Sequence, residues 1–472
     1  MPDTSSSNPA AEPSDLSRRD FLRGGSAAAL LAWAGGVPVQ AAAATNQVAA
    51  GVVNPDGTTN YKGEAVPVHV GIVGCGPWGR EILKTLAGLT NGPVVAVCDT
   101  YANALKRAGT LAPDAHKYEN HQQLLADPTV EAVVVATPSH QHQDVVQDAL
   151  KAGKHVYCEA PLAASLQDAR AIAQVARAST GVYFQAGLQN RADKQILNLA
   201  TFIRTGVLGR PLKARQQFHK KQSWRVPAPT PDREKAVNWR LDRGFSPGLV
   251  GEFGVHQLDL ANLFFLARPV AFTGLGAVSQ WRDGRDVPDN VVAVFEYPGG
   301  VFLTYEASLG NSFDGELSLF FGSDCAVMVR DRRAWMFQEL DAPQLGWEVF
   351  AKRDAFYKES GIVLAAGYSK QAPTTTAPAT ASLDEKSALQ YALEAFLVNA
   401  YNHQTAVRDF NAAYDPKDLA ALKEYLASLE QTRLPAAGWA EGYESAVTVI
   451  KANEAVLNQR RIAFAPDWFA LG

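Results

Sequence analysis

Three glycines carry the strongest chemical pattern in the sequence. Gly74, Gly76 and Gly79 form the spacing G-x-G-x-x-G between an apolar run, "VHVGIV", and a helical pattern. There the first glycine allows a tight turn, the second lets the backbone approach a pyrophosphate, and the third lets strand and helix pack closely. Asp99 closes the next predicted strand, 20 residues after Gly79, where a carboxylate binds ribose hydroxyls. The pattern predicts NAD or NADP, and Asp99 favours NAD because it would repel a 2′-phosphate.

A second group of polar residues follows another apolar run, in "VVVATPSHQHQDVV". Thr137 and Pro138 lie at the predicted carboxyl end of this strand, where ligands of open parallel sheets bind. His140 and His142 have the spacing of a metal-binding pair, but zinc needs three or four ligands and the sequence supplies no others nearby. We therefore expect no metal. The alternative interpretation is that both histidines lie on a loop exposed to solvent.

A third group lies in "GEFGVHQLDLANLFF", which we expect to form one helix. Glu252, His256 and Asp259 are spaced four and three apart and would share one face of it. The other rows are apolar, which predicts a buried helix, and a buried Glu–His pair is costly unless it has a function. A carboxylate beside an imidazole orients it for proton transfer. The spacing predicts His256 as an acid/base residue oriented by Glu252, and the alternative is a solvent-facing polar stripe.

The elements that must position these residues fall into two parts. From 66 to 187, Val-rich runs alternate with helical patterns, which predicts a Rossmann-type, doubly wound parallel sheet. Within it, Ser165 and Asp168 resemble a helix capping box. From 188 to 472, strand-like runs with hairpin-length links predict an α/β domain with a mostly antiparallel open sheet. The Pro/Thr/Ala-rich stretch at about 370–386 predicts an exposed loop.

The first 65 residues predict export rather than a folded unit. "SRRDFLR" places Arg18 and Arg19 before an uncharged Ala/Gly-rich stretch that ends in small residues. This is typical of a twin-arginine signal peptide, over 1–44, followed by a linker over 45–65. A membrane anchor fits less well because glycines dilute the apolar stretch, so we expect no stable membrane insertion. The expected partner is the twin-arginine machinery, and the expected location is the periplasm or another exported compartment.

Composition restricts the class of partner. The 472 residues carry a formal charge of −4 and lack basic runs beyond isolated pairs, which argues against nucleic acid and favours a small molecule. The four cysteines have no CxxC spacing and are expected to be small core residues rather than a disulfide framework. Few disulfides fit a protein that folds before it is exported.

Several blocks in order resemble the glucose-fructose oxidoreductase and inositol dehydrogenase family, Gfo/Idh/MocA. The resemblance covers most of the chain from about Val66 and is carried by "GIVGCGPWG", Asp99, "LLADPTVEAVVVATPSHQH", "ALKAGKHVYCEAPLA" and "GEFGVHQLD". It implies a Rossmann domain, a second domain whose open sheet often forms an oligomer face, and oxidation or reduction of a sugar or cyclitol hydroxyl. Besides the glycines and Asp99, we expect the cofactor to contact Pro77, Trp78, Thr137, Pro138, His142 and Glu159.

One position departs from the family. Relatives usually have Glu-Lys-Pro where this chain has Glu159, Ala160 and Pro161, and the resemblance implies that their lysine lies near the substrate hydroxyl. Three interpretations follow. His256 acts alone; or Lys220 or Lys221 reaches the substrate, with Asp259 as a further substrate contact; or the chain no longer performs net dehydrogenation.

Export bears on these three interpretations, because the compartment outside the inner membrane has no nicotinamide pool. We therefore expect tightly bound NAD(P), with either a second substrate that reoxidises it or a redox-neutral reaction. The alternatives are a glycosidase, lyase or epimerase that passes through a keto sugar, and a non-catalytic sugar-binding protein. The resemblance also implies a homo-oligomer.

Overall fold

The computed structural model describes residues 67–330, 333–343, 361–364 and 386–471. The expected signal peptide over 1–44, the linker over 45–65 and most of the expected loop at 370–386 lie outside these residues. None of the described helices is long and apolar enough to cross a membrane.

The first sheet has six parallel strands in the order β3-β2-β1-β4-β5-β6. They are β1 (Val70–Val73), β2 (Val94–Cys98), β3 (His116–Tyr118), β4 (Ala132–Val135), β5 (His155–Cys158) and β6 (Phe184–Ala186). β1, β4 and β5 are buried at every position, because helices cover both faces of a doubly wound sheet. This confirms the predicted Rossmann-type architecture.

Amphipathic helices cover this sheet. They are α3 (Pro77–Ala87), α4 (Ala102–Ala108), α5 (His121–Ala126), α6 (His142–Lys151) and α7 (Leu166–Ala178). α3 buries Gly79, Ile82, Leu83 and Leu86, the spacing of one helical face. α7 begins after Ser165, whose Oγ accepts a hydrogen bond from the Asp168 backbone N–H at 3.1 Å, so the expected cap is present.

The second sheet has nine strands in the order β14-β13-β12-β11-β7-β10-β9-β8-β15. They are β7 (Pro211–His219), β8 (Ala271–Ala277), β9 (Asn290–Tyr297), β10 (Val301–Ser308), β11 (Glu316–Gly322), β12 (Cys325–Arg330), β13 (Arg333–Gln338), β14 (Gly361–Leu364) and β15 (Ile462–Ala463). All neighbours are antiparallel except β7 and β10. Burial alternates along β9 and β10, so one face packs on the core. The mostly antiparallel sheet is confirmed.

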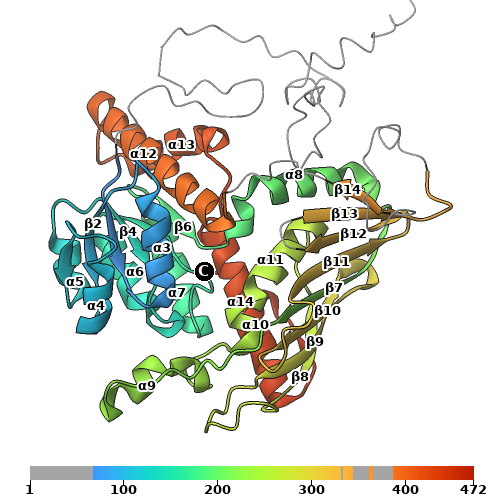
Figure 1. The fold of residues 1–472 in the computed structure, drawn as a ribbon. Helices are drawn as coiled ribbons and strands as arrows, with labels where there is room; N and C mark the ends of the chain where they lie inside the picture. The colour runs from blue at the N-terminus through green and yellow to red at the C-terminus, as the bar shows by residue number, and fades with distance from the viewer. Residues whose placement is uncertain (1–66, 331–332, 344–360, 365–385, 472) are drawn as a thin grey trace, which may run out of the picture. The chain divides into compact units, whose positions relative to one another are not determined.

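Three helices lie on one face of the second sheet: α10 (Gly248–Glu252), α11 (Gly254–Phe265) and α14 (Trp439–Asn458) (Figure 1). The remaining helices are α8 (Lys194–Phe202), α9 (Glu234–Val237), α12 (Ala388–Ala413) and α13 (Leu419–Ser428). α12 returns to the first sheet, where Phe396 packs edge-on against Tyr157 of β5. Part of the segment assigned to the second domain therefore completes the packing of the first.

All four cysteines are free and buried, as expected for small core residues. Cys75 and Cys98 lie at the ends of the first strands, and burial raises the pKa of each thiol to about 12. Thiols with such high pKa values are unreactive at neutral pH.

Candidate active site

The glycine-rich turn has the geometry that its spacing predicts. Gly74 follows β1 with a φ of 99°, and a β-carbon there would lie 2.5 Å from the carbonyl oxygen of Ala136, at the end of β4. A β-carbon on Gly79 would overlap the carbonyl oxygen of Gly74, whereas one on Gly76 would meet nothing within 4 Å. The turn thus draws strand, helix and the β4 loop together and leaves the backbone at Gly76 open.

This turn lies where ligands bind in open parallel sheets. The chain runs outward from β1 in one direction and from β4 in the other, and ligands bind outside the carboxyl ends of strands at such a switch point. α3 begins at Pro77 with no side chain capping it, and Trp78 beside it is 43% exposed. The first N–H groups of α3 therefore remain available to a phosphate.

Asp99 ends β2 beside the same turn. Its Oδ2 accepts a hydrogen bond from the Cys75 backbone N–H at 2.8 Å, and its Oδ1 accepts one from the Tyr101 N–H at 2.8 Å. Each carboxylate oxygen keeps a further lone pair, so both can still accept ribose hydroxyls. The carboxylate also fixes the glycine-rich turn, a second role that the spacing alone did not predict.

Thr137 and His142 differ in what their side chains do. Thr137 follows β4, and its Oγ1 is buried without a hydrogen-bond partner among the described residues. His142 is 1% exposed, with Nδ1 at 3.2 Å from the Leu162 carbonyl oxygen and Nε2 at 2.9 Å from that of Thr137. Burial lowers the pKa of this imidazole. We expected His142 to contact the cofactor directly. Because both of its ring nitrogens face backbone carbonyl oxygens, its side chain instead holds the Thr137–Pro138 loop.

Glu159 follows β5 and is buried, with 6% of its surface exposed. Its Oε1 has no hydrogen-bond partner in the described part of the chain. Burial raises the pKa of this carboxyl to about 7, although Trp78, the Ala160 N–H and Tyr157 oppose the rise. A carboxyl in this state exchanges protons near neutral pH, which is typical of functional sites.

The expected helix through Glu252 and His256 is two helices. α10 ends at Glu252 and α11 begins at Gly254, with a break at Phe253, whose φ and ψ are −110° and −46°. The fourfold spacing therefore does not set Glu252 and His256 on one helical face. The prediction that Glu252 orients His256 is wrong in this structure, because the Glu252 carboxylate has other partners.

Those partners are Ser139 and Arg240. Ser139 Oγ donates to Glu252 Oε1 at 3.0 Å, and Arg240 Nε donates to Oε2 at 2.7 Å. Ser139 belongs to the loop after β4, so Glu252 ties this loop to the second sheet's helices. The Arg240 guanidinium also lies 4.3 Å from the centre of the Trp239 ring. Neither residue was predicted from the sequence, since neither has a motif or spacing that links it to Glu252.

His256 is held at its backbone rather than at its ring. Asn190 Nδ2 donates to the His256 carbonyl oxygen at 3.2 Å. No hydrogen bond reaches the ring nitrogens from the described part of the chain. Burial lowers the pKa of the imidazole to about 4, so the ring is neutral at pH 7 and able to accept a proton.

Asp259 is a structural residue rather than a substrate contact. It is 1% exposed, and both of its oxygens accept from Arg191 Nε, at 2.9 and 3.0 Å. Ser445 Oγ of α14 adds a hydrogen bond at 3.3 Å. Burial raises the pKa of this carboxyl while Arg191 opposes the rise. A buried carboxylate with these partners links α11 to α14 and is not free for a substrate.

Lys220 and Lys221 lie on the exposed surface just after β7. Their backbone N–H groups donate to the Ser308 carbonyl oxygen at 2.9 Å and to Ser312 Oγ at 2.7 Å. Within the described residues, neither ammonium group contacts Glu159, Glu252 or His256. Among the described residues, the structure therefore does not place either ammonium group beside the predicted acidic and histidine side chains.

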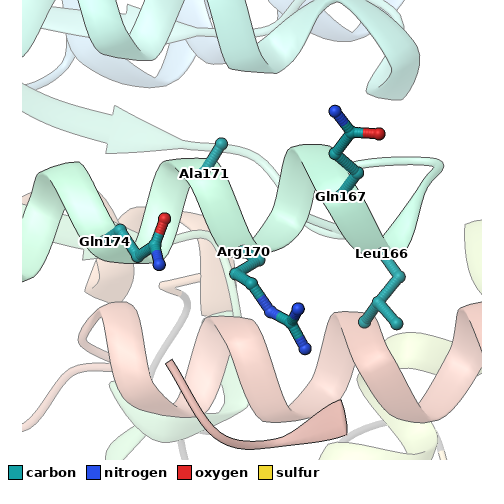
Figure 2. A pocket seen from close by; sticks show the side chains of 5 residues that line it. All are labelled: Leu166, Gln167, Arg170, Ala171 and Gln174. Atoms are coloured by element: carbon teal, nitrogen blue, oxygen red, sulfur yellow. The ribbon is translucent and has the colours of Figure 1, made fainter. Parts of the chain in front are cut away.

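No group of three or more His, Cys, Asp or Glu side chains among the described residues is arranged to hold a metal ion. A hollow of about 570 Å³ lies along α7, lined by Leu166, Gln167, Arg170, Ala171 and Gln174 (Figure 2). None of the predicted site residues lines it. Arg170 Nε instead donates to the Tyr443 hydroxyl of α14 at 3.2 Å, so this side chain fastens α7 to α14.

These features define an NAD-binding, Rossmann-type protein with a second α/β domain. Residues 68–187 match the domain described as "Oxidoreductase family, NAD-binding Rossmann fold", GFO_IDH_MocA, and residues 196–324 match the GFO/IDH/MocA C-terminal domain. The two matches together span more than half of the chain. The protein belongs to the Gfo/Idh/MocA oxidoreductase family.

Individual relatives share about a third of their residues with this chain over the aligned parts. Inositol 2-dehydrogenase of Salmonella paratyphi B is 35% identical over 31% of this chain and 44% of that protein. Inositol 2-dehydrogenase of Acidothermus cellulolyticus is 33% identical over 51% of this chain and 66% of that protein. The chain thus matches less than half of the length of the former.

Among solved structures, levoglucosan dehydrogenase in complex with NADH and L-sorbose shares the fold, with a TM-score of 0.60 over 84% of this chain and 99% of that one. Its sequence identity is 16%, so this likeness concerns the fold alone.

Proposed function

We propose that this protein transfers a hydride between a bound nicotinamide cofactor and a hydroxyl-bearing carbon of a sugar or cyclitol. The observation that carries the proposal is the glycine-rich turn, which leaves the backbone open at Gly76 beside two buried, unpartnered polar atoms, Thr137 Oγ1 and Glu159 Oε1. Inositol and levoglucosan dehydrogenases among the relatives support the substrate class.

The residues present fit a dinucleotide. The N-terminus of α3 and the backbone around Gly76 would hold the pyrophosphate, and Asp99 would accept the ribose hydroxyls. The end of the site that would hold the nicotinamide is bordered by Trp78, Thr137, Pro138 and Glu159. When bound, the nicotinamide supplies a hydride acceptor or donor. Asp99 favours NAD, since a carboxylate would repel a 2′-phosphate.

His256 is the proposed acid/base residue at the reacting hydroxyl. Its neutral ring can accept the hydroxyl proton as the hydride leaves the carbon, and it returns the proton in the reverse direction. Asn190 holds its backbone, and the Glu252 network with Ser139 and Arg240 positions the start of α11. Glu252 is thus a positioning residue for the loop and the helix.

A redox-neutral reaction is the second candidate, favoured by Ala160. The only cation that meets Glu252 in the described residues is Arg240, and an arginine keeps its charge and does not exchange a proton. Without a lysine, a transient keto sugar could be used for elimination, addition or epimerisation rather than released. Lys220 and Lys221 are exposed and make a poor substitute.

We further propose that the protein is exported with its cofactor tightly bound, and that it is a homo-oligomer. The twin-arginine pattern and the lack of a nicotinamide pool outside the cytoplasm support retention. Alternate side chains of β9 and β10 are exposed, which supports self-association through this face of the nine-stranded sheet.

One experiment separates these functions. The purified protein is given a panel of sugars and cyclitols, and the bound cofactor is followed by the absorbance of reduced nicotinamide. A dehydrogenase reduces the cofactor, a redox-neutral enzyme forms product without net reduction, and a sugar-binding protein does neither. Denatured protein that releases no NAD(H) or NADP(H) would contradict tight binding in the exported form.

A further inference from the structure

Glu159 shares one face of β5 with a second buried polar group. Tyr157 and Glu159 are two residues apart, and side chains two apart along extended backbone point to the same side. Tyr157 is fully buried, and its hydroxyl lies near Glu159 and Gln189 without a well-formed hydrogen bond among the described residues. Burial and then the nearby Glu159 raise the pKa of the phenol well above its ordinary value. The two groups therefore lie close together at the carboxyl end of β5, where burial raises the pKa of Glu159 and Tyr157 opposes that rise, and Glu159 Oε1 has no well-formed hydrogen bond from the described residues.

Gly187 lies so close to Glu159 that only a residue without a side chain fits there. A β-carbon on Gly187 would lie 2.9 Å from Glu159 Cα and 3.0 Å from Oε2, so any larger residue there would press on the carboxyl. β6 ends at Ala186, and the Gly187 N–H donates to the Cys158 carbonyl oxygen at 2.7 Å, which fixes this close approach. The space beside Glu159 is thus built by the backbone of the neighbouring segment.

Among the described residues, no cation lies close enough to Glu159 to compensate its charge. The titratable groups near it are Tyr157 and Cys158 of its own strand, both neutral. α3 contributes Trp78 and the β6 end contributes Gly187, neither of which is charged. Ala160 fills the position where relatives usually have a lysine. An isolated buried carboxylate is costly, so a positive charge that comes close favours the ionised form of this carboxyl.

We propose that Glu159 supplies this site with a redox-linked proton: its carboxyl is ionised beside the positively charged, oxidised nicotinamide and protonated beside the neutral, reduced one. The inference rests on the proposed cofactor binding and deepens it. An ionised Glu159 would compensate the positive charge of the oxidised ring, which no neighbouring side chain among the described residues does. In return, the ring would be the positive neighbour that a lysine at position 160 would otherwise provide to Glu159.

The charges and electrons balance. Oxidation of the alcohol carbon would transfer a hydride to a bound nicotinamide, whose positive charge would be lost, and would release the hydroxyl proton to His256, which then gives that proton up. Uptake of one proton by the Glu159 carboxylate removes its negative charge at the same time. Once His256 has returned to its neutral form, the carboxyl and the nicotinamide together carry no net charge either before or after hydride transfer.

The test is a redox titration of the protein-bound cofactor between pH 5.5 and 8.5. Reduction of free NAD⁺ takes up one proton for each pair of electrons. We expect the protein-bound couple to take up about two near pH 7, because Glu159 titrates between its two states. Glu159→Gln should restore one proton per electron pair. Glu81→Gln, an exposed change on the same helix as Trp78, is the matched control and should behave as the unchanged protein.

Infrared difference spectra between the oxidised and reduced states of the unchanged protein give a second readout that needs no variant. A protonated carboxyl band should appear on reduction. One proton per electron pair and no such band would overturn the inference while leaving the proposed function intact. A protein that binds neither form of the cofactor would overturn both.

Discussion

The glycine-rich turn after β1 and the broken helix around Phe253 are the two halves of the proposed active site, and they differ in how local their determinants are. At the turn, Gly74 and Gly79 are required by backbone within a few residues or at the end of the adjacent strand, and Gly76 leaves the backbone open. At the break, Glu252 is held by Ser139, 113 residues away, and by Arg240 of another segment. The cofactor side of the site is set by local backbone geometry, whereas the substrate side is set by long-range packing.

The largest expected effect is on the substrate side. If His256 is the acid/base residue, His256→Ala should lower turnover by about 100- to 10,000-fold, with cofactor binding unchanged. Steady-state kinetics and bound nucleotide content measure the two separately. Near-normal turnover would place proton transfer on another residue, and loss of the cofactor as well would mean that the two halves are not separable.

A pair of glycine variants tests the cofactor side. Gly79→Ala places a β-carbon against the Gly74 carbonyl oxygen, so it should destabilise the fold by about 2–4 kcal/mol and abolish nucleotide binding. Gly76→Ala meets no protein atom within 4 Å and should leave the unfolding free energy unchanged while weakening nucleotide binding. Denaturant unfolding and nucleotide titration measure both. Equal stability losses would contradict the geometry of the turn.

Acidification should weaken the fold through histidines that are wholly buried, His155 and His403, or partly buried, His256. Burial lowers the pKa values of His155, His256 and His403 to about 4. Because these values lie below that of an unfolded histidine, the stability they contribute is complete above about pH 6.5 and is lost as the pH falls toward 4.

On acidification the free energy of unfolding should fall by up to about 3 kcal/mol for each histidine. Urea unfolding at several pH values measures this loss. His155 accepts a hydrogen bond at Nδ1 from the Tyr183 N–H, so His155→Leu should flatten part of the pH dependence. His219→Gln, a change at a more exposed histidine, serves as the control. A flat profile from pH 7 to 4 in the unchanged protein would contradict the burial of these rings.

The smallest expected effect concerns the connection between the two halves. Glu252→Ala leaves Ser139 and Arg240 without their partner, so the unfolding free energy should fall by about 1–2 kcal/mol. Arg240→Ala should account for part of this loss, and the double variant should cost less than the sum. If Glu252 instead orients His256, Glu252→Ala would reduce turnover as strongly as His256→Ala does.

The sequence predicted the fold and the geometry of the glycine-rich turn because their patterns are local. Alternating buried runs and helical periodicity define the parallel sheet, and the glycine spacing defines its turn. The N-cap at Ser165 is equally local.

The substrate side was predicted less well. A break at Phe253 cannot be found from a fourfold spacing, and no motif links Glu252 to Arg240. Asp259 and His142 looked like site residues, but the tertiary contacts of Arg191, Leu162 and Thr137 engage their polar atoms. Helical spacing indicates which residues could share a face, but partners from distant segments decide what each side chain does.

The central claim is that a nicotinamide cofactor held at the Gly74–Gly79 turn exchanges a hydride with a sugar or cyclitol. The most direct measurement is the absorbance of reduced nicotinamide after sugars and cyclitols are added to the purified, cofactor-loaded protein in the absence of any second substrate. The account predicts reduction of up to one equivalent of bound cofactor, lost in His256→Ala. Cofactor that stays bound and oxidised with every sugar, while no product forms, would contradict it.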